Sequence, residues 1–322
     1  MKSFHRFFTK REPPNQMTMS TRRDALKHLV MAAGTAVLPV SAAPSGTAAF
    51  TYCLNMSTLR GHKLGFRKEL ETAAKAGFRS VEIWVDTLQE FVKSGHSVTD
   101  ARRLAGDLGI TLENAIGFAP WIVPDAAART KGVEQLKQEM ELLHGAGCRR
   151  IATPPAGATT GERLDLYEVA DRYHHILELG IQAGVIPQLE LWGFSKNLSK
   201  LGEVLFVAVQ SGLPQARVLL DVYHLYKGGS GNATLPLAGT AGMEIFHLND
   251  YPGTIPVDKV TDADRVYPGD GVAPIGDILR TIRKADHPII LSLEVFNKSY
   301  WAQDALTVAR TGLAKLKAVT PR

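Results

Sequence analysis

From residue 50 onward, the chain alternates short apolar runs with longer segments in which apolar residues recur every three or four positions. The short runs are typical of buried strands and the longer segments of amphipathic helices. Several helical segments end at a glycine suited to a left-handed cap, as at Gly77 and Gly147. Eight apolar runs follow this pattern: 50–56, 80–85, 110–116, 149–155, 186–192, 217–223, 244–250 and 289–295.

This alternation predicts an α/β fold with parallel strands and crossover helices. Eight strand–helix units over residues 50–322 favour a single closed (β/α)8 barrel, which we expect to be the catalytic domain. An open doubly wound sheet would usually carry a glycine-rich phosphate turn after its first strand, where this chain has NMSTLRGHK. The flexible segment 226–236 falls inside one strand–helix unit, so the sequence gives no linker between two smaller domains.

Residues 1–43 are predicted to be a twin-arginine signal peptide with an N-terminal extension. Arg22 and Arg23 precede a modest apolar run at 29–40, which is too short for a stable membrane anchor, and small residues suited to cleavage follow near Ala42 or Ala43. The alternative is an untargeted amphipathic tail. An export signal predicts a periplasmic or otherwise exported protein.

The net charge of +5 belongs to this N-terminal segment, which holds seven basic and two acidic residues. The remaining residues contain equal numbers of basic and acidic side chains, so their net charge gives no reason to expect nucleic-acid binding. The two cysteines, Cys53 and Cys148, are expected to be small buried residues rather than a disulfide or a metal site.

Each of the last four predicted strands carries a polar side chain at or near its end: Glu190, Asp221, His247 and Glu294. The carboxyl ends of barrel strands share one face, which carries the active site in enzymes of this fold. Crowded carboxylates repel one another, and only a strong positive charge lets all of them stay ionised.

We therefore predict one divalent metal ion, held by the three carboxylates and the imidazole. Hard oxygen ligands with a single histidine favour Mn²⁺, with Mg²⁺, Co²⁺ or Zn²⁺ as alternatives.

The motifs LELWG (189–193), LLDVYH (219–224), FHLND (246–250) and LSLEVF (291–296), with DRVYPGDG (264–271) between the last two, resemble the sugar phosphate isomerase/epimerase family. This family of xylose isomerase-like TIM barrels includes ketose 3-epimerases, hydroxypyruvate isomerase and inosose-processing enzymes. The resemblance implies that Glu190 and Glu294 both bind the metal and exchange a proton with the substrate. It also implies substrate contacts from His224 and Arg265. Asn249 stands where relatives often carry a lysine.

The expected reaction is proton abstraction next to a metal-polarised carbonyl, with an enediolate intermediate. Return of the proton to the opposite face gives epimerisation, and return to the adjacent carbon gives isomerisation. Loss of a β-hydroxyl would make the protein a dehydratase, as in inosose dehydratase relatives. A non-catalytic exported carbohydrate-binding barrel is a further alternative.

The substrate is expected to be a small carbohydrate without phosphate, because the sequence has no basic cluster or helix-terminal glycine turn for one. Trp84 and Trp192 follow strand ends and could supply flat apolar walls, and Asn55 could bind a hydroxyl. Arg265 could instead pair with Asp262 or Asp264. A nuclease built on the same barrel would need three zinc ions and additional histidines that the corresponding loops lack. We expect no stable membrane anchor, and a homo-oligomer is compatible with the sequence.

Overall fold

A computed structural model of the chain describes residues 50–239, 242–283 and 288–321, and the predicted signal peptide lies outside them. The eight predicted strands are all present, each parallel to its neighbours. Their bounds are β1 Phe50–Asn55, β2 Ser80–Trp84, β3 Thr111–Ile116, β4 Arg150–Thr153, β5 Ile186–Glu190, β6 Arg217–Asp221, β7 Ile245–His247 and β8 Ile289–Leu293.

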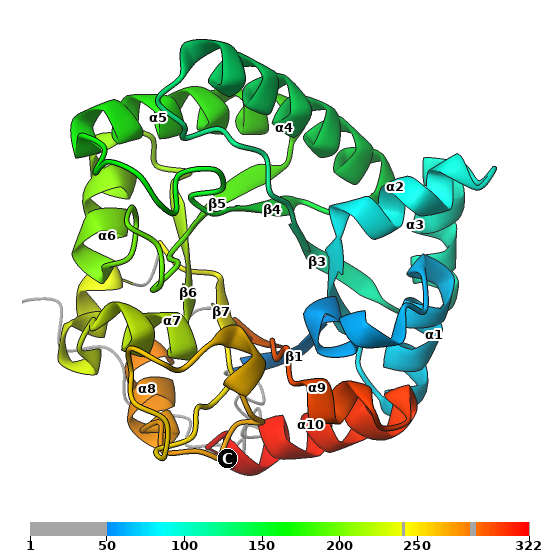
Figure 1. Cartoon of the computed structure of the whole chain (residues 1–322). Coiled ribbons are helices and arrows are strands. Elements are labelled where there is room, and N and C mark those ends of the chain that lie inside the picture. The colour runs from blue at the N-terminus through cyan, green and yellow to red at the C-terminus, as the bar shows by residue number, and fades with distance from the viewer. Residues whose placement is uncertain (1–49, 240–241, 284–287, 322) are drawn as a thin grey trace, which may run out of the picture. The chain divides into compact units, whose positions relative to one another are not determined.

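The strands follow the order β3-β2-β1-β8-β7-β6-β5-β4 and form a nearly closed barrel ringed by helices (Figure 1). The two ends of this order, β3 and β4, are joined by Arg150, whose guanidinium donates to the backbone carbonyl of Glu113 at 3.1 Å. The predicted (β/α)8 barrel is therefore confirmed.

Helices cover the outside of the barrel (Figure 1). They are α1 Phe66–Ala76, α2 Val85–Lys93, α3 Val98–Asp107, α4 Ala126–Ala146, α5 Leu166–Ala183, α6 Leu201–Gln210, α7 Val222–Gly228, α8 Ile275–Ile282, α9 Lys298–Trp301 and α10 Ala305–Val319, with 3-10 turns η1 Met56–His62, η2 Asn232–Ala238 and η3 Asp262–Asp264. No helix among the described residues is long and apolar enough to span a bilayer.

Apolar side chains from strands and helices form the core, which includes Leu54, Ile83, Leu189 and Phe246. Both cysteines are buried and unpaired, as predicted. Gly147 ends α4 with φ of 88°, a left-handed conformation that residues with a Cβ rarely adopt.

The predicted strand at 244–250 is shorter in the structure and stops at His247, because the next polar side chains bind other parts of the chain. The Asn249 side chain accepts from the Tyr223 amide at 3.1 Å. The Asp250 carboxylate accepts from the amides of Tyr251, Gly269, Gly271 and Ala273. Asp250 therefore holds in place the loop that carries Arg265.

Gly180 gives α5 a close approach to β5, the strand that ends in Glu190. A Cβ at position 180 would lie 2.4 Å from Pro187 Cδ and 2.5 Å from the Val185 carbonyl oxygen. We therefore expect Gly180→Ala to lower the free energy of unfolding by about 1–3 kcal/mol through overpacking.

Urea denaturation measures this effect, with Gly106→Ala as the matched control. Gly106 is helical and exposed with open space around its Cβ position, so alanine there should stabilise the protein by up to about 1 kcal/mol. Equal stability changes in the two variants would contradict the close packing of α5 on β5.

Candidate metal centre and cavity

The strands β6, β7 and β8 bring three of the predicted ligands together. Asp221 lies directly opposite His247 in the parallel ladder, and Glu294 follows the last residue of β8. One potential ligand atom from each of the three residues lies within 4.8 Å of the other two, and all three residues are buried.

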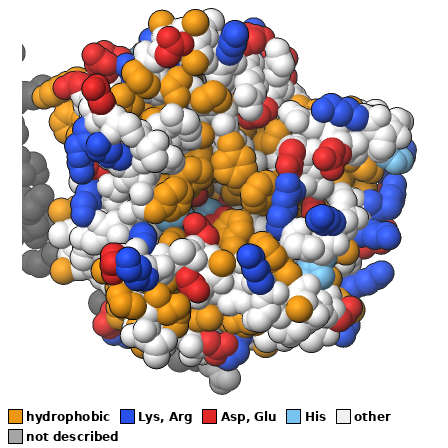
Figure 2. All heavy atoms as spheres, viewed as in Figure 1, with side chains coloured by type: hydrophobic (Ala, Val, Ile, Leu, Met, Phe, Trp, Pro, Cys, Tyr) orange, Lys and Arg blue, Asp and Glu red, His pale blue; other side chains and the backbone are white. Residues whose placement is uncertain are grey.

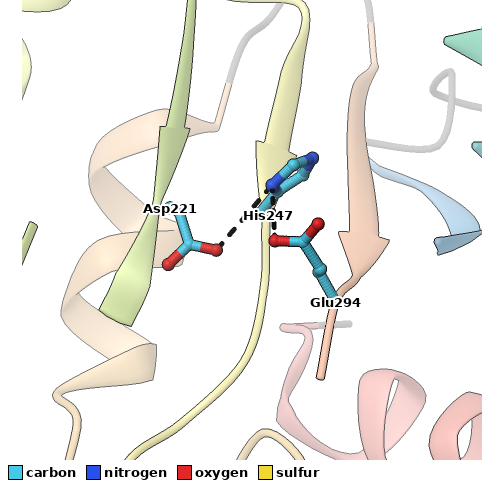
Figure 3. A group of neighbouring side chains, drawn as sticks. All are labelled: Asp221, His247 and Glu294. Carbon is cyan, nitrogen blue, oxygen red and sulfur yellow. Dashed lines mark ion pairs between the residues drawn. The ribbon is translucent and has the colours of Figure 1, made fainter. Parts of the chain in front are cut away.

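Figure 3 shows one imidazole nitrogen of His247 facing both carboxylates. This atom, Nδ1, lies 3.1 Å from Glu294 Oε2 and 3.8 Å from Asp221 Oδ2. The contacts have ion-pair distances, yet neither ring nitrogen of His247 makes a hydrogen bond of acceptable geometry to a described residue. A buried nitrogen between two carboxylate oxygens is a donor set that fits a divalent cation.

Glu190, the fourth predicted ligand, ends β5 and is buried in the same region. It does not belong to the group of three whose ligand atoms lie within 4.8 Å of one another. Its place in the ladder is opposite Leu219, two residues before Asp221. Coordination by Glu190 therefore stays a prediction.

Arg265 supplies positive charge at the same carboxylates. Its Nη1 donates to Glu294 Oε2 at 2.7 Å and to Asp221 Oδ2 at 3.2 Å, and its Nη2 is paired with Asp262. The pairing with Asp262 is the alternative considered from the sequence, and the bonds to the two predicted ligands were not foreseen. A metal ion beside His247 Nδ1 would share Asp221 Oδ2 and Glu294 Oε2 with this guanidinium.

Glu82 is the main site residue that the sequence analysis missed. It lies on β2 with its Oε2 2.9 Å from His247 Nε2, on the opposite side of the ring from Asp221 and Glu294. Asn55, Asn114 and Ser292 all donate to its carboxylate. A buried carboxylate next to the nitrogen that does not bind the metal fixes the orientation of a metal-binding histidine. Glu82 lies beside Nε2 of His247, so Nδ1 remains available for the ion. The signal for it in the sequence was a glutamate in the middle of an apolar strand.

The charges of the cluster determine the pKa values of its members. Burial alone would lower the pKa of His247, but the nearby Glu294 and Glu82 carboxylates raise it well above its usual value. Burial would raise the pKa of Glu294, but His247 and Arg265 hold it below its usual range. For Glu190, burial dominates and raises the pKa to about 8, with a further increase from Glu294 and Asp221.

A cavity of about 300 Å³ opens next to this cluster. Six of the predicted residues line it: Trp84, Glu190, Trp192, His224, Arg265 and Glu294. Ile116, Phe118, Phe194, Asp262 and Phe296 complete the lining. Figure 2 shows hydrophobic side chains gathered around the hollow at the centre of this face. Its volume lies at the lower end of the roughly 300–1,000 Å³ typical of ligand pockets.

Asn55, predicted to contact the substrate, does not line this cavity. It is buried, and its Nδ2 donates to Glu82 Oε2 at 3.0 Å and to Glu294 Oε1 at 3.1 Å. Its Oδ1 accepts from the Ser57 amide. The side chain therefore holds the two glutamates in position, because its hydrogen-bonding capacity is used within the protein.

His224 lies in α7, whose first turn is capped by Asp221: the Asp221 carboxylate accepts from the His224 amide at 2.9 Å. Its Nε2 is 3.0 Å from Arg265 Nη2, and its Nδ1 is 3.3 Å from the Gly193 amide nitrogen. Burial and the neighbouring Arg265 lower the pKa of His224 well below its usual value, so the ring is neutral. A neutral imidazole accepts at one nitrogen only, so the ring accepts either from Arg265 or from the Gly193 amide, and the Arg265 contact is the shorter of the two.

Residues 70–319 match the family model described as xylose isomerase-like TIM barrel. The chain belongs to this family. It is 24% identical over 269 residues to inosose isomerase of Halalkalibacterium halodurans, covering 80% of this chain and 93% of that protein. It is 25% identical to 3-dehydroshikimate dehydratase of Pseudomonas putida, covering 77% of this chain and 39% of that protein.

Among solved structures, the chain is similar to the IOLI protein, whose crystal structure has a binding zinc atom. The TM-score is 0.77 at 21% identity, covering 84% of this chain and 98% of that one. This likeness supports the barrel fold. The two sequence relatives are an isomerase and a dehydratase by name.

We expect Glu82→Gln to weaken the binding of Mn²⁺ or Zn²⁺ by about 10–100-fold, because His247 loses the charge that orients it. Isothermal titration of chelator-treated protein measures the dissociation constant.

Glu139→Gln is the matched control, since Glu139 is also a buried carboxyl but lies on α4 and binds Gln135. It should bind the ion as the unaltered protein does. Unchanged affinity in Glu82→Gln would show that Glu82 does not orient the ligand.

Proposed function

We propose that this protein is a divalent-metal-dependent isomerase or epimerase acting on a sugar, keto-sugar or related polyol. The observation that carries the proposal is that Glu190 and Glu294 line one cavity beside the cluster of Asp221, His247 and Glu294. Two carboxyl groups at one cavity are an arrangement that can remove a proton and return it. Membership of the family and the inosose isomerase relative support the same reaction class.

Asp221, His247 and Glu294 would hold the ion, with Glu190 as the proposed fourth ligand. We favour Mn²⁺ because hard oxygen donors outnumber the single imidazole, and the zinc in the structure of the IOLI protein makes Zn²⁺ an alternative. When bound, a divalent ion polarises a carbonyl and makes the neighbouring C–H bond acidic.

The protein's own carboxyl groups then move the proton. Glu190 and Glu294 both line the cavity, so one can remove the proton and the other can return it. Delivery to the other face of the same carbon gives an epimer, and return by one residue to the adjacent carbon gives an isomer.

Dehydration is the second candidate reaction, and the 3-dehydroshikimate dehydratase relative favours it. The same proton abstraction followed by departure of a β-hydroxyl group would give this product. We further propose that the chain is exported, which rests on Arg22, Arg23 and the apolar run at 29–40 alone.

We expect Glu190→Gln and Glu294→Gln each to lower kcat by about 10²–10⁴-fold, because each removes a proton-transfer group. The assay follows turnover of a ketose panel with Mn²⁺ present. Glu134→Gln, an exposed carboxyl on α4, is the control and should keep full activity. Activity retained in either cavity variant would remove that residue from the chemistry.

Chelator treatment should abolish turnover of the ketose panel, and Mn²⁺ should restore it. In D₂O, deuterium incorporated at the carbon that lost its proton would identify an epimerase, and deuterium incorporated at the adjacent carbon would identify an isomerase. A product that has lost water would identify a dehydratase. Metal binding without turnover of any compound would favour the non-catalytic carbohydrate-binding barrel.

A further inference from the structure

The cavity beside the metal cluster carries one continuous aromatic wall. The ring centroids of Trp84 and Phe118 are 5.1 Å apart, those of Phe118 and Trp192 6.1 Å, and those of Trp192 and Phe194 5.2 Å. Phe194 then lies 5.6 Å from the ring of His224. The wall therefore runs from the end of β2 across the loops after β3 and β5 to α7.

The wall extends beyond the buried part of the site. Phe118 and Phe194 have exposed fractions of 42% and 44%, whereas Glu190, Glu294 and His224 are buried. Exposed phenyl rings at a cavity suit an apolar ring face, and the proton-transfer groups do not need them. They lie where a part of the ligand outside the reacting unit would make contact.

The positive charge on the described lining of the cavity is already paired with carboxylates. Among the described lining residues, Arg265 is the one cation, and the three carboxyl groups of Glu190, Asp262 and Glu294 outnumber it. Its Nη1 donates to Asp221 and Glu294, its Nη2 contacts Asp262 and His224, and its Nε is buried. A divalent ion would cancel the charge of the lining itself, and the nearby carboxylates of Asp221 and Glu82 keep the whole cluster negative.

A second arginine, Arg60, lies near the wall but is also engaged. Its guanidinium carbon stacks 4.1 Å from the centroid of the Trp84 ring. Its nitrogens bind Asp86 and Thr87. It therefore supports the wall and leaves no unpaired charge for a phosphate or a carboxylate.

From this wall and these charges we infer that the substrate is an uncharged, two-ring compound: a reacting ketose unit with a second sugar or similar ring attached. This inference rests on the proposed function and makes its substrate class more specific. The ketose unit lies beside Glu190 and Glu294, and the second ring contacts Phe118 and Phe194. Phosphate esters and acidic sugars are disfavoured because Arg265 is already paired and the nearby carboxylates repel a negative charge.

Three compounds that differ only at the C6 oxygen test the inference: fructose, isomaltulose (6-O-glucosyl-fructose) and fructose 6-phosphate. We measure hydrogen exchange at C3 in D₂O with Mn²⁺ present, and binding from quenching of tryptophan fluorescence. Isomaltulose should bind about 10-fold more tightly than fructose, and fructose 6-phosphate should bind most weakly. Preference for fructose 6-phosphate, or equal binding of all three, would overturn the inference.

Phe118→Ala and Phe194→Ala should each raise KM for isomaltulose by about 3-fold, so that together they remove the roughly 10-fold advantage, and each should leave KM for fructose unchanged. Tyr167→Ala removes an exposed aromatic ring on α5 outside the cavity and should change neither value. If an alanine variant is unstable, Phe118→Leu and Phe194→Leu remove the aromatic ring but keep apolar bulk. Like the alanine variants, they should raise KM for isomaltulose more than KM for fructose. Equal losses for both sugars would contradict a second-ring subsite.

The fluorescence readout separates the two proposals. Tight isomaltulose binding that depends on Phe118 and Phe194, but without any hydrogen exchange, would support the two-ring ligand and contradict the proposed catalysis. Exchange with fructose that does not improve with isomaltulose would support the catalysis and overturn the two-ring ligand.

Discussion

The structure depends on how negative charge is balanced around one buried imidazole. Glu82, Asp221 and Glu294 all lie within ion-pair distance of His247, and all four residues are buried. Carboxylates removed from water are costly unless positive charge lies against them. His247 and Arg265 supply part of that charge. His247 Nδ1 makes no hydrogen bond of acceptable geometry to a described residue, so it can bind a metal ion.

The barrel is what makes this concentration of charge possible. Parallel pairing places Asp221 level with His247 and brings Glu294 to the same end of the sheet. The second layer is equally specific, because Asn55 bridges Glu82 and Glu294 while Asn249 donates to Asp221 at 2.7 Å. Two neutral amides thus donate hydrogen bonds to all three carboxylates.

The fold and the end of the barrel that holds the site were predictable from sequence because both follow from periodicity. Buried strands end in polar residues, and parallel strands put those ends together, so Asp221, His247 and Glu294 could be grouped without coordinates. The roles of Glu82 and Asn55 could not, since each depends on side-chain direction across neighbouring strands. The contacts of Arg265 depend on a long loop fixed by Asp250, and no local pattern encodes that path.

The most direct test of the metal centre is diffraction from crystals grown with Mn²⁺, recorded at a wavelength where manganese scatters anomalously. The account predicts a single strong peak about 2–2.3 Å from His247 Nδ1 and from oxygens of Asp221 and Glu294. Glu190 should complete the ligand set. No peak at these residues, with Arg265 still bound to both Asp221 and Glu294, would contradict it.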